Sequence, residues 1–250
     1  MIQPFLSVIV PAHNEAERLP LTLLDIDRYL NEAEYASEIL VVNDGSTDKT
    51  AEIVRRMSGA VKNLKLVENE TNAGKGAAVK KGMLLTRGKI RLFTDADGSI
   101  SIDHFERILP YFKEGCEVVI ASRALKESRL NHPQSLPRRF AERIENLVIR
   151  ALVTPGIRDT QCGFKAFSED AAERIFSVIK ASGWAFDVEA LALAQKFGYR
   201  MKEVPIAWAE RESAVRRRHR LQTLLETFRI RWWLTTFEKS YKPRNHESHG

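Results

Sequence analysis

The chain has 250 residues, 44% of them hydrophobic and 29% charged, with a formal net charge of +6 at pH 7. This length and balance are typical of a globular protein with a sizeable core, and they exclude a disordered chain. No apolar run approaches the ~18–20 residues that a membrane-spanning helix needs. The two cysteines, Cys116 and Cys162, lack CxxC spacing, so the sequence predicts neither a zinc site nor a disulfide framework and favours a reducing, cytosolic setting.

The positive charge lies at the C-terminal end of the chain. Residues 211–250 carry ten Lys or Arg and four Asp or Glu, whereas residues 1–210 carry 29 of each sign. A basic segment on a neutral body is typical of a protein that meets an anionic surface, either nucleic acid or lipid headgroups.

The first half of the chain alternates strand-like and helix-like segments. Short apolar or β-branched runs predict strands at 5–10, 38–43, 64–69, 89–95 and 116–122. Helical patterns lie between them, at 18–31, 48–58, 74–87 and 103–113. This rhythm predicts right-handed crossovers and one mostly parallel, Rossmann-like α/β sheet flanked by helices.

The pattern changes after residue 122. A polar, basic loop occupies 123–139 and is too long to be a simple connector. Helices are expected at 138–153, at 169–180 and over "FDVEALALAQKFGY", and a last strand over "MKEVPIAW". The segment 218–238 predicts an amphipathic helix with four aromatic residues, Phe228, Trp232, Trp233 and Phe237.

Polar loops follow the first four predicted strands: "PAHNE", "NDGSTD", "NETNAGKG" and "DADGS". Because ligands of parallel sheets bind outside the carboxyl ends of the strands, we expect these loops to converge on a site. The first loop lacks GxGxxG, so no dinucleotide pyrophosphate is expected on the first helix. In "NAGKG" the glycines permit close backbone approach to a ligand, and Lys75 offers a point charge to a phosphate.

The aspartates of "NDGSTD" allow two interpretations. Asp48 is expected to cap the helix at 48–58. Asp44 ends a strand, where it either belongs to the turn or accepts hydrogen bonds from a base or a ribose.

"TDADGS" allows two interpretations as well. Asp95 and Asp97 either end a strand and begin a turn, or they form half of a metal site. Proteins bind Mg²⁺, and similarly Mn²⁺, through one or two carboxylates plus substrate phosphates. A diphosphate would complete the half-site that this pair supplies.

These motifs together carry a resemblance that runs from about residue 5 to 232. In their order and spacing, "SVIVPAHNEAERLPLTL", "EILVVNDGSTDKTAEIV", "NAGKGAAVKKGM" and "LFTDADGS" resemble family 2 glycosyltransferases of the GT-A fold. "DTQCGFKAF", "GWAFDVEALALAQKFGYRMKEVPIAW" and the Arg-rich stretch after them resemble the dolichyl-phosphate (polyprenyl-phosphate) β-glucosyltransferases, relatives of dolichyl-phosphate mannose synthase.

The resemblance implies a donor site. Its nucleotide-binding positions match Pro11, Glu15, Asp44 and Lys75. Asp95 and Asp97 match the DxD pair, with Asp97 the expected direct ligand of Mg²⁺ or Mn²⁺ and Asp95 reaching the nucleotide or sharing the metal. Mannose synthases often carry Gln where this chain has Ser99, which leaves the third protein ligand of the metal open and favours the glucosyl branch.

On the acceptor side, the resemblance implies a cationic clamp on the acceptor phosphate. Arg123 and Arg138 match its arginines, with Arg139 as an alternative to Arg138, although either could be a solvated loop charge. Asp159 either orients a sugar or begins a turn. A phosphate monoester has a second pKa near ~6, so at pH 7 this acceptor needs no strong general base.

The implied reaction is metal-dependent, inverting transfer of a hexose, with glucose from UDP-glucose favoured, to dolichyl or polyprenyl phosphate. GDP-mannose as donor and a glycan as acceptor remain alternatives. A nucleic-acid-binding protein would account for the basic tail, but it leaves the carboxylate-rich loops unexplained. A sugar-phosphate nucleotidyltransferase would carry a Gly-rich, Arg-containing loop in place of "PAHNE".

A lipid-linked acceptor stays in the bilayer, so the enzyme must reach it there. We expect a glycosyltransferase domain at 1–210, with a nucleotide-binding half at 1–122 and an acceptor-binding half at 123–210. Residues 211–250 are expected to form a basic tail on the cytosolic face of a membrane. The alternative is a C-terminal helix that packs on the globular domain through Trp232 and Trp233.

Overall fold

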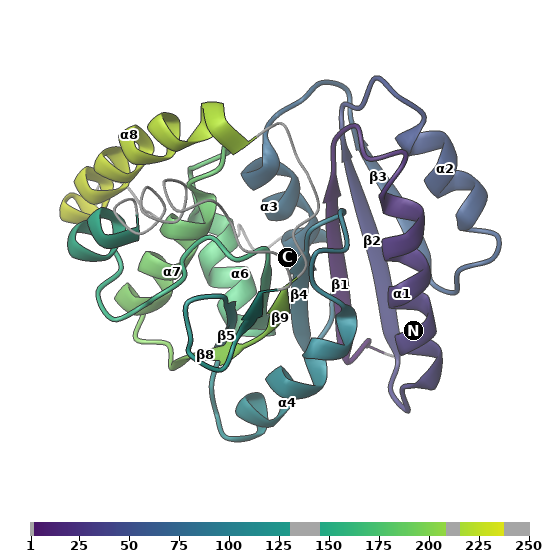
Figure 1. Ribbon diagram of the computed structural model, residues 1–250, viewed down its shortest axis with the longest axis horizontal. Helices are drawn as coiled ribbons and strands as arrows, with labels where there is room; N and C mark the ends of the chain where they lie inside the picture. The colour runs from purple at the N-terminus through teal and green to yellow at the C-terminus, as the bar shows by residue number, and fades with distance from the viewer. Residues whose placement is uncertain (1–2, 131–145, 209–215, 238–250) are drawn as a thin grey trace, which may run out of the picture.

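The computed structural model describes residues 3–130, 146–208 and 216–237 (Figure 1). A seven-stranded sheet has the order β3 (Leu64–Asn69), β2 (Ser37–Asp44), β1 (Leu6–Ala12), β4 (Ile90–Thr94), β7 (Phe164–Ser168), β5 (Val118–Ser122) and β8 (Met201–Pro205). A separate two-stranded sheet pairs β6 (Arg129–Leu130) with β9 (Ala207–Trp208). The predicted α/β class with one mostly parallel main sheet is confirmed.

One strand of the main sheet, β7, runs antiparallel to both of its neighbours, β4 and β5. The sequence analysis did not predict this strand, because its apolar run is interrupted by Lys165, which is fully buried here. Thr94 at the carboxyl end of β4 pairs with Phe164 at the start of β7. The loop that precedes β7 therefore lies at the same edge of the sheet as the end of β4.

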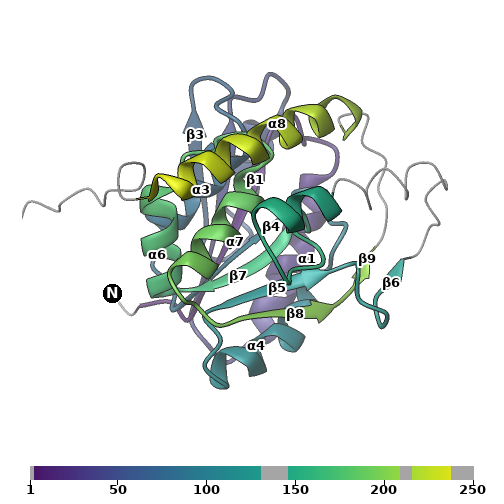
Figure 2. The same cartoon turned by 90° about the vertical axis from the view of Figure 1, so that its left-hand side faces the viewer.

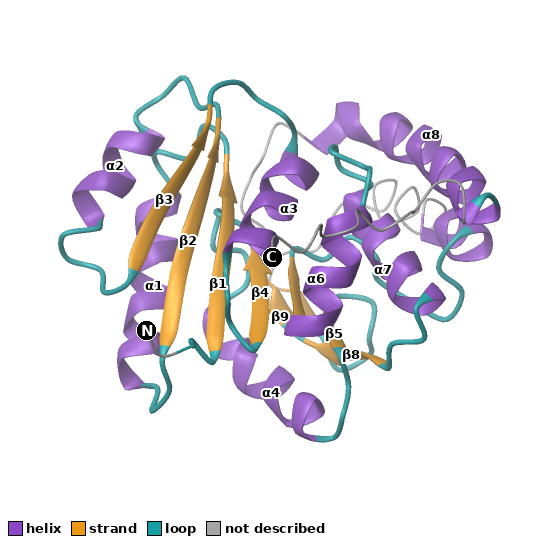
Figure 3. Cartoon of the chain, turned by 180° about the vertical axis from the view of Figure 1, so that it is seen from behind, coloured by secondary structure: helices purple, strands orange, loops and turns teal. Residues whose placement is uncertain are grey.

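Helices cover both faces of the sheet (Figure 3). One face carries α1 (Leu19–Glu32), α2 (Thr50–Met57) and α4 (Phe105–Lys113), and the other carries α3 (Lys75–Leu85), α6 (Glu169–Val178) and α7 (Phe186–Lys196). Successive side chains of a strand point to opposite faces, so Val8 and Val10 of β1 join the first core and Ile9 joins the second.

The strands and helices expected before residue 123 are all present, with small shifts at their ends and a short 3₁₀ turn, η1 (Ile102–His104), before α4. The second half was predicted less completely. The sequence analysis missed β6, and the expected last strand divides into β8 and β9 at Ile206. The helix expected at 138–153 is helical at 146–152, and its first part lies outside the described residues.

The basic C-terminal segment forms α8 (Arg216–Thr235), which runs along the outer side of α7 (Figure 2). Ile230 is buried against α7, with Trp233 and Leu234 partly buried beside it. Leu225, Phe228 and Trp232 are exposed by 71%, 56% and 62%. Because apolar side chains lie on both the packed and the exposed side, the single apolar face expected of an amphipathic helix is not confirmed.

Among the helices of the described ranges, none is both long and apolar enough to cross a membrane.

Gly82 on α3 tests how tightly the second core is packed. A Cβ on Gly82 would overlap Cγ2 of Ile9 in strand β1. We expect Gly82→Ala to lower the free energy of unfolding by about 1–2 kcal/mol, because overpacking outweighs the gain in helix propensity. Urea unfolding measures this. Gly59→Ala is the control, since its Cβ would meet no atom closer than 3.7 Å, and equal stability of the two variants would contradict the packing argument.

Candidate donor-binding site

A cavity of about 450 Å³ lies at the carboxyl ends of β1, β2 and β4 and at the first turn of α3. The sequence analysis assigned six residues to donor or metal binding, and all six line this cavity: Pro11, Glu15, Asp44, Lys75, Asp95 and Asp97. Their individual roles toward a ligand stay predictions. What the structure adds is how each of these side chains is held.

Asp44 is buried at the end of β2 and holds the loop that follows β3. Its carboxylate accepts hydrogen bonds from Nδ2 of Asn69 (2.7 Å) and from the amides of Ala73 (2.9 Å) and Gly74 (2.8 Å). Gly74 has a φ of 100°, and a Cβ there would overlap the carbonyl of Ser182. Asp44 therefore fixes the backbone that begins α3 and places the next residue, Lys75, in the cavity wall.

Lys75 and Asp95 form an ion pair, with 2.5 Å between Nζ and Oδ1. Burial alone would lower the pKa of Lys75, but the charge of Asp95, followed by that of Asp187, raises it above its ordinary value. The amide of Asp95 donates to the carbonyl of Gly163 (3.1 Å), and a Cβ on Gly163 would overlap the Asp95 carboxylate. Gly163 is thus a site-forming residue that the sequence analysis missed, because its place beside Asp95 depends on the antiparallel strand β7.

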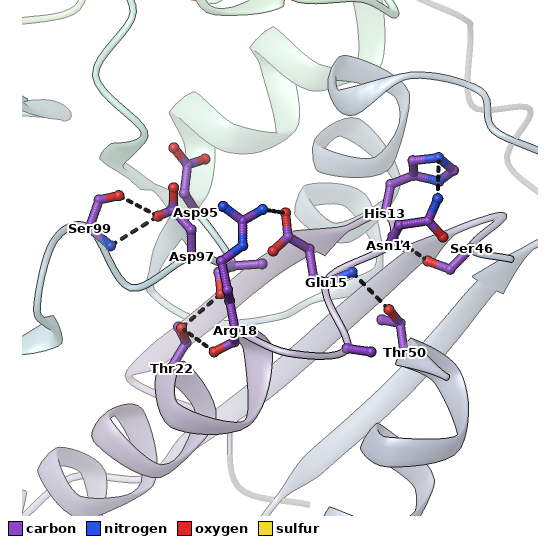
Figure 4. Close-up of polar contacts among 12 residues, drawn as sticks. His13, Asn14, Glu15, Arg18, Thr22, Ser46, Thr50, Asp95, Asp97 and Ser99 are labelled. Carbon is purple, nitrogen blue, oxygen red and sulfur yellow. Dashed lines mark hydrogen bonds and ion pairs between the residues drawn. The ribbon is translucent and has the colours of Figure 1, made fainter. Parts of the chain in front are cut away.

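Asp97 is held by its own loop (Figure 4). Ser99 donates to Oδ1 of Asp97 from both its amide (2.9 Å) and its hydroxyl (2.6 Å). Thr22 of α1 donates its hydroxyl to the carbonyl of Ala96 (2.7 Å), which ties the loop to the helix. Among the described residues no hydrogen bond reaches Oδ2 of Asp97. Ser99 therefore orients Asp97.

Glu15 and Arg18 form a second ion pair on the cavity wall, 2.5 Å apart (Figure 4). The other carboxylate oxygen of Glu15, Oε2, is buried and has no hydrogen-bond partner. Burial raises the pKa of Glu15; Arg18 opposes this shift, and the charges of Asp97 and Asp95 add to it. Glu15 and the two aspartates therefore share one electrostatic environment.

The donor set fits a divalent cation bound together with phosphates. Among the described residues, four carboxylates and two cations line the cavity, a formal surplus of two negative charges. In the described part of the chain, no group of three or more His, Cys, Asp or Glu side chains is placed to hold a metal alone. Asp97 Oδ2 and the unpaired Glu15 Oε2 instead suit an ion such as Mg²⁺ or Mn²⁺, which takes few carboxylates and completes its shell with phosphate oxygens.

A buried ion pair lies behind Lys75. Lys165 of β7 is fully buried, and its Nζ lies 2.6 Å from Oδ1 of Asp187 at the start of α7. Burial raises the pKa of Asp187, and the charges of Lys165 and Lys75 oppose the shift. Charges thus alternate from Asp95 through Lys75 and Asp187 to Lys165, which keeps each buried group beside an opposite charge.

The predicted acceptor residues Arg123 and Asp159 contact each other. Both oxygens of the buried Asp159 accept from the Arg123 guanidinium at 2.8 Å, and the Arg123 amide adds a third bond of 2.8 Å. Neither residue lines the donor cavity. Their roles toward an acceptor stay predictions, and Arg138 and Arg139 lie outside the described residues.

Trp184 and Gln222 also line the cavity, and neither was assigned a role from the sequence. Trp184 lies before α7, and the centroid of its ring is 5.3 Å from Nζ of Lys75. Gln222 reaches the cavity from α8 and donates to Glu226 (2.8 Å). Glu226 in turn accepts from the amide of Ala185 (3.3 Å), so α8 contributes to the wall of the donor site.

Known proteins resemble this chain in sequence and in fold. The family model Glycosyl transferase family 2 matches residues 7–176. Dolichyl-phosphate beta-glucosyltransferase of Dictyostelium discoideum is 39% identical over 218 residues, covering 82% of this chain and 67% of the relative. The protein of the same name from Homo sapiens is 34% identical, covering 84% and 68%. The chain thus spans about two thirds of the length of these relatives.

Two solved structures share the fold at low identity. Mycobacterium tuberculosis glucosyl-3-phosphoglycerate synthase, crystallised with Mn²⁺, UDP-glucose and phosphoglyceric acid, has a TM-score of 0.67 at 22% identity and covers 91% of this chain and 79% of its own. Mannosyl-3-phosphoglycerate synthase from Rubrobacter xylanophilus has a TM-score of 0.69 at 17% identity, covering 99% and 78%.

The Arg123–Asp159 pair generates a stability prediction. Burial alone would raise the pKa of Asp159, but Arg123 outweighs it and holds the pKa below its ordinary value. We expect Arg123→Met to lower the free energy of unfolding at pH 7 by about 2–4 kcal/mol, because it leaves a buried carboxylate without its cation.

The pH dependence of this loss follows from the direction of the pKa shift. A lowered pKa stabilises the fold above the ordinary pKa of Asp, and this contribution is lost as the pH falls through the lowered value. The difference between wild type and Arg123→Met should therefore shrink in acid, as measured by urea unfolding from pH 7 to pH 3. Arg158→Met, an exposed neighbour, is the control and should stay within about 0.5 kcal/mol. A constant difference would refute the assignment.

Proposed function

Because the chain belongs to glycosyltransferase family 2, we propose that it transfers glucose from UDP-glucose to a polyprenyl phosphate such as dolichyl phosphate, with inversion at the anomeric carbon. The observation that carries this proposal is the convergence of Asp95, Asp97 and Lys75 on one cavity at the carboxyl edge of the sheet. The names of the relatives that match 82–84% of the chain support the sugar and the acceptor.

The donor side of the reaction follows from the charges in the cavity. Asp97, oriented by Ser99, and Asp95, held by Lys75, would hold the metal ion, which supplies Lewis-acid stabilisation of the departing nucleoside diphosphate. Lys75 is kept cationic by its carboxylate neighbours and presents its charge to the diphosphate. The solved relative with Mn²⁺ and UDP-glucose supports a divalent ion without deciding between Mg²⁺ and Mn²⁺.

The acceptor side requires position more than basicity. A phosphate monoester is largely ionised at pH 7, because its second pKa is near ~6, so the attacking oxygen needs no proton removed. The protein instead has to hold that oxygen in line with the anomeric carbon. Arg123, whose orientation is fixed by its paired hydrogen bonds to Asp159, is our candidate among the described residues for guiding the acceptor phosphate.

Transfer assays test both the reaction and the metal site. Protein, Mg²⁺ or Mn²⁺ and polyprenyl phosphate are incubated with labelled UDP-glucose or GDP-mannose, and organic-extractable label is counted. We expect label from UDP-glucose. Label from GDP-mannose alone would show that the donor is GDP-mannose and not UDP-glucose. Label from neither donor would refute a lipid acceptor.

Asp97→Asn should lower kcat at least about 100-fold in this assay, because a metal ligand stabilises several kcal/mol of developing charge. Asp48→Asn is the matched control. Asp48 accepts from the amides of Ala16 (3.1 Å) and Thr50 (2.9 Å) and lies outside the cavity, so its loss should cost stability more than turnover. An active Asp97→Asn would contradict the metal assignment.

We also propose that α8 rests on an anionic lipid surface, which would bring the donor site to a membrane-bound acceptor. Leu225, Phe228 and Trp232 lie three and four residues apart, so they share one face of the helix, and they are exposed. Arg229 and Arg231 are exposed as well, and residues 211–250 together carry a surplus of six positive charges. Apolar and aromatic side chains beside basic ones are typical of interfacial helices.

Vesicle flotation tests this docking. We expect wild-type protein to float with vesicles that contain phosphatidylserine and not with phosphatidylcholine alone. Replacing Leu225, Phe228 and Trp232 with Ser should reduce the bound fraction about tenfold or more. Full burial of one such apolar side chain contributes ~1.5–3 kcal/mol, and each replacement removes that contribution. Replacing Leu21 and Leu24 of α1, also exposed, with Ser is the control. Equal flotation of the α8 variant would refute the docking face.

A further inference from the structure

An arginine at position 18 does not stabilise the helix that it precedes, so helix stability does not explain its presence. It is the N-cap residue of α1, and its side chain makes no capping hydrogen bond. The N-terminus of a helix carries a partial positive charge, so a cation there is unfavourable unless something else attracts it. Arg18 lines the donor cavity, with 29% of its side chain exposed.

Among the described residues, the Arg18 side chain pairs with Glu15. One oxygen of Glu15 pairs with Arg18, and the other is buried and unpartnered. Asp97 and Asp95 are close enough to Glu15 to raise its pKa. Figure 4 shows the Arg18 guanidinium reaching into the space between Glu15 and the two aspartates. Arg18 therefore brings a positive charge to the place where the carboxylates concentrate negative charge.

The ion pair is not needed to hold the loop after β1. The amide of Glu15 donates to the hydroxyl of Thr50 (2.9 Å), and the amide of Ala16 donates to Asp48 (3.1 Å). These two bonds already fix the loop to the start of α2. The Glu15–Arg18 pair adds a side-chain contact on the cavity wall, where it can exchange partners without unfolding the loop.

We propose that Arg18 is a second phosphate-binding cation of the donor site, kept by Glu15 and transferred to the donor's diphosphate. This inference rests on the proposed function, since it assumes a nucleoside diphosphate donor. A divalent ion held by Asp97 would repel the neighbouring Arg18 guanidinium, and the oxygens of a bound diphosphate would attract it. The guanidinium fork matches two phosphate oxygens at once, which a lysine cannot do.

The same exchange would free Glu15. With Arg18 on the diphosphate, both carboxylate oxygens of Glu15 would be available to balance the positive charge of a bound ion. Arg18 therefore balances the carboxylates when donor and metal are absent and the phosphates when they are bound. Lys75, paired with Asp95, and Arg18, released from Glu15, would hold the diphosphate from two separate segments of the chain.

Calorimetry of Arg18→Met and Arg18→Lys tests this role. With Mn²⁺ present, Arg18→Met should bind UDP about 10- to 100-fold more weakly, the equivalent of a charge-assisted hydrogen bond. Uridine has no phosphate, so its affinity should be the same for wild type and for Arg18→Met. Arg18→Lys should bind UDP with intermediate affinity. Arg28→Met is the control, because Arg28 lies on the same helix, pairs with Asp103 and does not line the cavity.

Binding of Mn²⁺ alone, followed by electron paramagnetic resonance, gives an independent readout. Removing a competing cation should leave the affinity of Arg18→Met for Mn²⁺ unchanged or tighter. Wild-type affinity of Arg18→Met for UDP would overturn the proposal, and so would equal weakening of UDP, uridine and Mn²⁺ with a lowered melting temperature. If wild type binds UDP but transfers no sugar to polyprenyl phosphate, the acceptor assignment fails while Arg18 keeps its role. If GDP-mannose is the donor, GDP and guanosine replace UDP and uridine.

Discussion

Several carboxylates meet at one edge of the sheet, and each requires a hydrogen-bond or charge partner; the rest of the site depends on how these partners are supplied. Asp44, Asp95, Asp97 and Glu15 meet where the strands end, and each would be costly there without a partner. Backbone amides and an amide side chain satisfy Asp44, and Lys75 satisfies Asp95. The described lining of the cavity still carries a surplus of negative charge, which suits the cation that we propose for this site.

The antiparallel strand β7 extends this network below the cavity. It places Gly163 beside Asp95, where any side chain would collide with the carboxylate. It also buries Lys165 against Asp187, so that the charge of Lys75 is balanced from both sides. A lysine in the middle of a sheet is costly in itself, and its position here is explained by the site that it supports.

Helix α8 joins two surfaces with different tasks. Gln222 and Glu226 face the donor cavity and the turn before α7, whereas Leu225, Phe228 and Trp232 face outward. Neighbouring residues of one helix thus belong to the cavity wall and to the proposed lipid-facing surface. Of the two interpretations that the sequence left open, packing on the domain is observed, through Ile230 and Trp233 and not through the exposed Trp232. Contact of the other face with a membrane stays a proposal.

The sequence by itself determined the α/β class, the strand and helix positions before residue 123, and the loops that carry the donor residues. It could do so because strand–helix periodicity is local and because parallel strands must end at one edge. Tertiary structure alone decided which residues far apart in the chain pair: Lys75 with Asp95 and Arg123 with Asp159. Pairing depends on strand order and on the direction of β7, and a one-dimensional pattern does not encode either.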